Sequence, residues 1–305
     1  MKHTFLILIT VLVTSCALDR QTDYDIDYAL EFQPAMYMHV YAEGTDRYPA
    51  DLTFGVCAWS LSEKDSWKED SQEAEVFLPL TEALPLADGK TWAFDETVMW
   101  PSRHERVTFL AYSPYEAEGK CDPNKGICYE NVDVATSQTD LLYTDPIEDM
   151  SKMECGGVVA VPFRHALCGI NFRIKNRVNE KEKIIIKKIE LDQAKHCGDF
   201  CSLAEPQWSL RDETMPFVFF EGTYQTGHHP AEIGRSILML PQKLDTEVTV
   251  EYDYVTEAGT FITQKLKTTA LQKALQPGKN YTFTITVGID DVKFLVEIIE
   301  DLLYI

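Results

Sequence analysis

The sequence predicts an all-β protein built from two sandwich domains, and three observations lead to this prediction. Apolar and polar residues alternate with a period of two in runs rich in Val, Ile, Thr, Phe and Tyr, and this pattern is typical of strands. Turn-forming segments, such as 43–46 and 276–279, separate the runs. Many short strands at this spacing favour β-sandwiches over a parallel α/β sheet.

The expected strands follow one another along the whole chain. They are Met36–Tyr41, Leu52–Leu61, Arg106–Tyr112, Gly157–Phe163, Ile170–Ile174, Ile184–Leu191, Ser236–Leu240, Glu247–Tyr254, Thr260–Leu266 and Tyr281–Val287. The charged segment 62–75 is expected to form a loop or one surface helix. An acidic segment at 148–157 interrupts the two strand-rich halves, so we predict domains at 35–153 and 154–305.

The first residues predict export as a lipoprotein. Lys2 precedes an apolar stretch of ten residues, 4–13, which is too short to span a bilayer and is typical of a signal peptide. Residues 13–15 then supply the branched and small side chains that a signal peptidase requires before a lipidated cysteine. We therefore predict a signal peptide at 1–15, a lipid on Cys16 and an acidic tether at 16–34 that attaches the protein to the outer membrane at the cell surface.

Length and charge limit the classes of function. Removing 15 residues from 305 leaves 290, which is enough for two domains. The formal net charge of -21 repels phosphate backbones, and the one short basic patch, at 181–188, does not offset it. We expect no nucleic-acid partner. No later apolar run is long enough for a transmembrane helix.

Seven of the eight cysteines remain once Cys16 carries the lipid. Cys121 and Cys128 flank a turn-rich segment, so a local disulfide between them is expected outside the cytoplasm. Cys57 and Cys168 lie in apolar runs and are interpreted as small core residues.

A second cysteine pair leaves two interpretations open. Cys197 and Cys201, together with His196, could ligate a metal, but a second ligand pair at a finger-like spacing is missing from the sequence. A disulfide or free thiols are the preferred interpretation. We expect no metal and no other cofactor.

Several motifs together resemble the fimbrillin family, the type V pilins of Bacteroidota. The midpoint motifs are 140–144, 158–167 and 170–174, and the later ones are 238–242 ahead of 248–254, and 277–285. Their order and spacing, with the lipidation motif, extend the resemblance over nearly the whole chain. The resemblance implies two transthyretin-like β-sandwich domains in a cell-surface fimbrial subunit whose partners are other fimbrial subunits.

The resemblance also implies that an Arg- or Lys-directed protease removes the first strand of a lipidated precursor. Arg47 lies in the turn-like segment 44–49, between the first two expected strands, so cleavage there would release the first strand together with the lipid. Arg20, in the predicted tether, is a competing site whose cleavage would shed the lipid and keep the strand. An arginine in an exposed turn is also often only a solvated residue.

Loss of a strand would expose unpaired backbone groups and an apolar groove, which a segment of another subunit can fill by strand addition. The C-terminal run at 292–299 is a candidate donor, because Phe294, Val296 and Ile298 share one face of a strand. The same run could equally be an ordinary edge strand of the second domain.

The sequence favours a protein without catalytic activity. It contains no G-x-S-x-G elbow and no H-E-x-x-H helix. His228 and His229 are interpreted as a surface turn, and His165 as a packed or capping residue. The alternative to a fimbrial subunit is a lipid-anchored binding module for a carbohydrate or a host protein that never polymerises. Trp67, in a polar segment, is its one candidate for an exposed contact.

Overall fold

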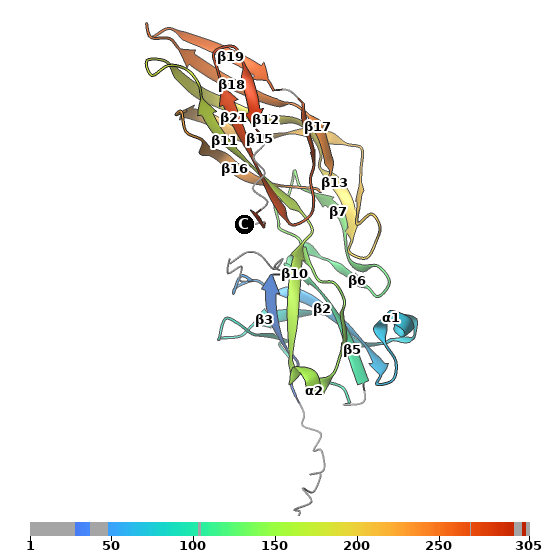
Figure 1. The fold of residues 1–305 in the computed structure, drawn as a ribbon. Helices are drawn as coiled ribbons and strands as arrows, with labels where there is room; N and C mark the ends of the chain where they lie inside the picture. The colour runs from blue at the N-terminus through green and yellow to red at the C-terminus, as the bar shows by residue number, and fades with distance from the viewer. Residues whose placement is uncertain (1–27, 37–47, 103–104, 269, 296–300, 303–305) are drawn as a thin grey trace, which may run out of the picture.

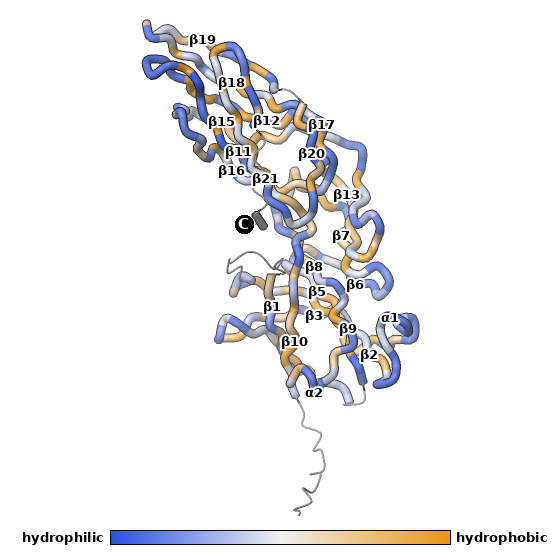
Figure 2. The backbone as a smooth tube through the Cα atoms, in the orientation of Figure 1, coloured by the Kyte–Doolittle hydropathy of each residue, from blue (hydrophilic) through white to orange (hydrophobic). Residues whose placement is uncertain are grey.

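The computed structural model describes residues 28–36, 48–102, 105–268, 270–295 and 301–302. Over these residues the chain is all-β, as predicted, and its sheets form two lobes that follow one another along the long axis of the molecule (Figure 1). Hydrophobic stretches lie along the strands, and hydrophilic stretches lie in the outlying loops (Figure 2). No helix among the described residues is long and apolar enough to cross a membrane.

The lower lobe in Figure 1 contains one sheet of eight strands. In the order in which they pair, these are β2 (Phe54–Ser62), β3 (Glu75–Pro85), β4 (Trp92–Ala93), β1 (Glu31–Met36), β10 (Val158–His165), β8 (Leu142–Tyr143), β5 (Glu105–Ser113) and β9 (Ile147–Met150). β2 also pairs with β5, so β5 contacts strands from both ends of this order.

The upper lobe contains two larger sheets and one small one. One has the order β16 (Ala231–Met239), β11 (Cys168–Asn176), β21 (Lys279–Val287) and β22 (Val292–Leu295), with β23 (Asp301–Leu302) also on β21. The other has the order β15 (Thr214–Gln225), β12 (Lys183–Lys195), β18 (Val248–Val255) and β19 (Phe261–Lys267). The small one pairs β17 (Lys243–Thr246) with β20 (Leu271–Ala274).

A further sheet joins the two halves of the sequence. Its order is β14 (Trp208–Leu210), β13 (Cys197–Cys201), β7 (Gly126–Asp133) and β6 (Lys120–Asp122). The structure therefore differs from the domain boundary predicted between residues 153 and 154. β10 belongs to the sheet of the lower lobe, and strands of the first half pair with strands of the second, because sheet pairing is non-local and leaves no mark in the local pattern.

β2 separates two hydrophobic cores, because both of its faces are buried. Val56 and Ala58 face one cluster of buried side chains, here called the first core, in the lower lobe. Cys57 and Trp59 face the other, here called the second core, which continues into the upper lobe and includes Phe172. Alternate residues of a strand point to opposite faces, so burial on both sides explains why the run at 52–61 is apolar almost throughout.

Helices are short. α1 (Trp67–Asp70) and the 3₁₀ turn Ser71–Glu73 lie within the charged segment 62–75, where a loop or one helix was predicted. α2 (Lys152–Cys155) begins after Ser151, whose hydroxyl accepts the Glu154 N–H as an N-cap, and a second 3₁₀ turn covers Tyr115–Ala117.

Candidate functional site: the seat of the first strand

β1 is the strand that the predicted processing would remove, and it lies inside the sheet of the lower lobe (Figure 1). Its residues Glu31–Met36 run parallel to Val158–Phe163 of β10, residue for residue. On its other side, β4 pairs with β1 at a single position, where Phe32 lies opposite Trp92. β1 is therefore held mainly by one continuous ladder, the one with β10.

The first strand begins earlier than the sequence predicts. It was expected at 36–41, and the structure has β1 at Glu31–Met36, so residues 31–34 of the predicted tether belong to the strand. Residues 37–41 lie outside the described residues. Pro34 is compatible with its position inside β1. The Leu30 N–H bonds on the side away from β10, and the Glu31 N–H bonds on the β10 side. Pro34 is four residues after Leu30, so its nitrogen points to the same side as the Leu30 N–H, away from β10. On that side β4 pairs with β1 at Phe32 alone, so position 34 requires no N–H.

Phe32 inserts β1 into the first core. Its side chain has no exposed surface. Its ring centroid lies 6.0 Å from that of Phe54, 5.3 Å from that of Phe94 and 5.9 Å from that of Phe109, each with an edge-to-face geometry. Aromatic pairs prefer this arrangement. Removal of β1 would expose all three of these rings at once.

Tyr48 returns the chain to the same core directly after Arg47. Arg47 itself lies outside the described residues, as do Arg20 and Cys16. Tyr48 is 5% exposed, its ring stacks on Phe163 with centroids 5.2 Å apart, and its hydroxyl lies 2.7 Å from that of Ser113. Burial raises the pKa of the Tyr48 hydroxyl, although the hydrogen bond with Ser113 opposes this shift. A chain that began at Tyr48 would keep this anchor.

The C-terminal segment lies along the sheet of the upper lobe. β22 is antiparallel to β21, with Phe294 opposite Ile285, and β23 pairs with the start of β21, at Lys279 and Asn280. The other two residues of the candidate donor face, Val296 and Ile298, lie outside the described residues. Within this chain the segment is an edge strand, one of the two interpretations left open by the sequence.

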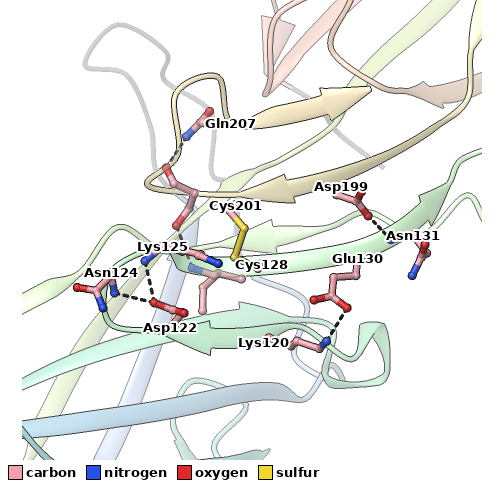
Figure 3. Close-up of a disulfide and its surroundings, with 12 residues drawn as sticks. Lys120, Asp122, Asn124, Lys125, Cys128, Glu130, Asn131, Asp199, Cys201 and Gln207 are labelled. Atoms are coloured by element: carbon pink, nitrogen blue, oxygen red, sulfur yellow. Dashed lines mark hydrogen bonds and ion pairs between the residues drawn. A yellow bond between two sulfur atoms is a disulfide. The ribbon is translucent and has the colours of Figure 1, made fainter. Parts of the chain in front are cut away.

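The predicted disulfide between Cys121 and Cys128 is wrong. Cys121 pairs with Cys57 across 64 residues of sequence, and Cys128 pairs with Cys201 across 73 residues. Figure 3 shows the second bridge, which joins β7 to β13. Cys201 is therefore not available to ligate a metal together with Cys197, which is a free thiol, as are Cys155 and the buried Cys168.

The register of the β6–β7 hairpin explains why the local bridge does not form. Cys128 lies opposite Lys120, whereas Cys121 lies opposite Ile127. Cross-strand partners share a face, and adjacent residues of a strand point to opposite faces. Cys121 and Cys128 therefore point away from each other, toward different strands.

The other sequence candidates are accounted for by packing. Trp67, the candidate for an exposed contact in the alternative function, is 4% exposed, and its ring centroid lies 5.7 Å from that of Trp59, so it is a packed residue. His165 is a packed residue, as interpreted, with Nδ1 2.7 Å from the Asp140 carboxylate. The pair 228–229 is exposed in a turn.

Comparison with known proteins decides the family. A sequence model described as fimbrillin-like matches residues 44–300. The chain belongs to the fimbrillin-like family. This fimbrillin-like chain is 22% identical over 362 residues to the fimbrium subunit Fim1C of Phocaeicola vulgatus, covering 97% of the chain and 94% of that protein. Its fold is similar to that of a fimbrial protein from Bacteroides vulgatus, with a TM-score of 0.67, 17% identity and coverage of 88% of this chain and 98% of the other.

Proposed function

We propose that the chain is a non-catalytic structural or adhesive subunit of a cell-surface fimbria. In this proposal it is exported as a precursor with a lipid on Cys16, attached to the outer membrane, and folds as two transthyretin-like β-sandwiches that share the second core. It then assembles with other fimbrial subunits. Membership of the fimbrillin-like family and the similarity to a fimbrium subunit over nearly the full length support this proposal.

The proposed assembly mechanism depends on the position of β1 in its sheet. In the proposal, a protease cleaves after Arg47 and thereby detaches β1, the tether and the lipid in one piece. Tyr48 keeps the new N-terminus anchored, because its ring and hydroxyl are held by the first core. The cleaved chain can then lose β1 without losing any other strand of the sheet.

Loss of β1 leaves a groove beside β10, here called the seat of β1, that matches an extended segment of another subunit. The β10 groups that now pair with Glu31–Met36 lose their partners, and an unpaired strand edge is a template for another chain. The Phe54, Phe94 and Phe109 rings lose the cover of Phe32. Backbone pairing thus provides affinity, and the apolar pocket left by Phe32 selects a large apolar side chain.

The C-terminal segment is the proposed occupant of this seat in a neighbouring subunit. Phe294, Val296 and Ile298 alternate in sequence as a strand requires to place one apolar face in a groove. Among the described residues, β22 pairs with β21 at Val292–Leu295 and lies at the edge of its sheet, so donation would have to give up these edge pairs and no central strand.

The N-terminal peptide of mature protein tests the processing step. Material sheared from the surface of producing cells is expected to begin at Tyr48, and Arg47→Ala should retain the lipidated N-terminus and abolish polymer. Arg20→Ala is the matched control and should leave both readouts unchanged. A mature chain that begins at residue 21, or unchanged processing of Arg47→Ala, contradicts the proposal.

Donation by the C-terminal segment has its own test. Ile298→Asp should abolish polymer while leaving processing at Arg47 intact, because a carboxylate on the apolar face cannot enter the seat. Glu297→Gln, on the opposite face of the same strand, should polymerise normally. If Ile298→Asp forms polymer of normal length, the donor strand is not the C-terminal segment.

A second candidate function is a lipid-anchored surface-binding module that never polymerises. It is favoured because the chain's own strands occupy both positions that strand exchange would use. β1 pairs with β10 in the lower lobe, and β22 pairs with β21 in the upper lobe. Mature protein that begins at an acylated Cys16 and contains β1 would support this function over the first.

A further inference from the structure

Three different metal-binding side chains meet at one end of the sheet that joins the two halves of the chain. Asp133 is the last residue of β7, Cys197 is the first residue of β13, and His196 precedes it. Asp133 and Cys197 are cross-strand partners in the β7–β13 ladder. The ligand atoms of the three residues all lie within 4.8 Å of one another.

The contacts centre on a single ring nitrogen. His196 Nδ1 lies 2.9 Å from Asp133 Oδ1 and 3.0 Å from Cys197 Sγ. One ring nitrogen is either a donor or an acceptor, depending on the tautomer. It therefore cannot donate to the carboxylate and accept from the thiol at the same time. The Cys197 thiol also hydrogen-bonds to the Asp133 carboxylate, so the three side chains form a closed triangle of contacts, and a cation that replaced the protons between them would engage all three ligand atoms.

A nucleophilic cysteine is a poorer interpretation of the same residues. In a Cys–His–carboxylate arrangement the thiol and the carboxylate contact different ring nitrogens, so that one orients the ring while the other is activated. Here both contact Nδ1, and Nε2 lies 3.9 Å from Sγ. The ring cannot pass a proton between the two groups through its opposite nitrogens.

The spacing suits a tetrahedral ion after a small adjustment. Zinc takes Cys sulfur at about 2.3 Å and His nitrogen or carboxylate oxygen at about 2.0–2.2 Å, which separates tetrahedral ligand atoms by roughly 3.3–3.6 Å. The side chains of His196 and Asp133 are 16% and 28% exposed, so both can move by the few tenths of an ångström required. They also leave an entry path for the ion.

The surroundings hold the ligands in place. Asp133 Oδ1 accepts the Ala135 N–H at 2.9 Å, and the His196 carbonyl accepts the Val134 N–H at 3.0 Å. The Arg211 guanidinium, whose charge acts on Cys197, is engaged with Asn131 and with Asp199.

We propose that Asp133, His196 and Cys197 bind one Zn²⁺ ion, with water in the fourth position. The ion would tie β7 to β13 at the end of their ladder opposite the Cys128–Cys201 disulfide, since Cys197 pairs with Asp133 and Cys201 with Cys128. One short ladder between the two halves of the sequence is then closed by a covalent bridge at one end and by a metal at the other. The role assigned to the ion is structural, because it would join the last residue of β7 to the first residue of β13.

Isothermal titration of the purified full chain with ZnCl₂ tests the site. We expect about one equivalent to bind, and Cys197→Ser to weaken binding by at least about 100-fold, since even outer-shell partners of a metal contribute roughly 10–100-fold. His165→Gln is the matched control. It removes the other His–Asp pair, with a 2.7 Å contact to Asp140 and no cysteine, and should leave the affinity unchanged.

Thiol alkylation tests the unsubstituted protein and does not depend on the folding of a variant. Zn²⁺ should protect Cys197 from iodoacetamide, as measured by peptide mass spectrometry, and should leave the half-buried thiol of Cys155 as reactive as before. The proposal is overturned if Zn²⁺ does not bind at micromolar concentration, if Cys197→Ser binds as tightly as the unsubstituted chain, or if Cys197 is not protected.

Discussion

Replacing Phe32 with alanine tests whether β1 is seated firmly enough for its removal to open a groove. The substitution removes one ring from the centre of the first core and leaves the backbone of β1 and its ladder with β10 in place. It therefore isolates the side-chain contribution of the strand. In the assembly mechanism proposed above, this is the contribution that a donor segment must later replace.

The size of the effect follows from burial and contacts. Phe32 is completely buried, and its ring lies within 6.0 Å of three other rings. Truncation of such a residue lowers the free energy of unfolding by about 3–5 kcal/mol. The loss combines the transfer free energy of the removed ring with the cost of the cavity that it leaves. We expect a value near the upper end, since each edge-to-face pair adds about 0.5–1.5 kcal/mol beyond the buried area.

Chemical denaturation of the precursor, which retains β1, measures this loss. Trp92 and Trp100 belong to the first core, so their fluorescence reports its unfolding. Phe261→Ala is the matched control: the chemical change is the same, but Phe261 is 64% exposed on β19, and surface substitutions stay within about 0.5 kcal/mol. A loss below about 1 kcal/mol for Phe32→Ala would refute the reasoning, because β1 would then contribute too little to leave a groove.

Two further predictions concern the upper lobe and the joining sheet. Replacing both Cys128 and Cys201 with serine should lower the free energy of unfolding by about 4 kcal/mol, the chain-entropy value for a loop of 73 residues, and melting under non-reducing conditions measures it. For Asp192, burial raises the carboxyl pKa, but hydrogen bonds from Lys267 and Thr249 outweigh it, so the pKa is lowered. Because the pKa of Asp192 is lower in the folded than in the unfolded state, its ionised carboxylate stabilises the folded protein above a pH of about 3.9, the pKa of the unfolded state. This stabilisation is lost as the pH falls through the folded-state pKa. Asp192→Asn should therefore lose less stability than the parent chain between pH 6 and pH 3, and equal acid limbs would contradict this.

Local patterning was sufficient to predict most of the strands. The run expected at 184–191 lies within β12, and the run expected at 281–287 lies within β21. In β21, buried residues recur at every second position from 281 to 287. In β12, the same period holds on either side of a bulge between Ile186 and Lys188. The start of β1 was not predicted, because a proline such as Pro34 fits a strand only when its nitrogen faces away from a pairing neighbour, and that is a property of the sheet rather than of the segment.

Pairing between distant strands could not be predicted in the same way. The cysteine partners were wrong because proximity in sequence places Cys121 and Cys128 in one hairpin, whereas register turns them to opposite faces. Asp133 was missed as a ligand because 63 residues separate it from His196. The only available signal was an acidic residue at the end of a strand, and with 49 acidic residues in the chain that signal is not specific.

The division of the interior into two cores explains how the chain could give up a strand and stay folded. β1 contributes only to the first core, whereas the second core draws side chains from both lobes. Cys57, in β2, faces the second core and is bridged to Cys121, while Cys128–Cys201 closes the ladder that joins the halves. Both crosslinks therefore lie away from the seat of β1. Strand loss would weaken one core, and the covalently linked core would keep the empty seat in shape until a donor fills it.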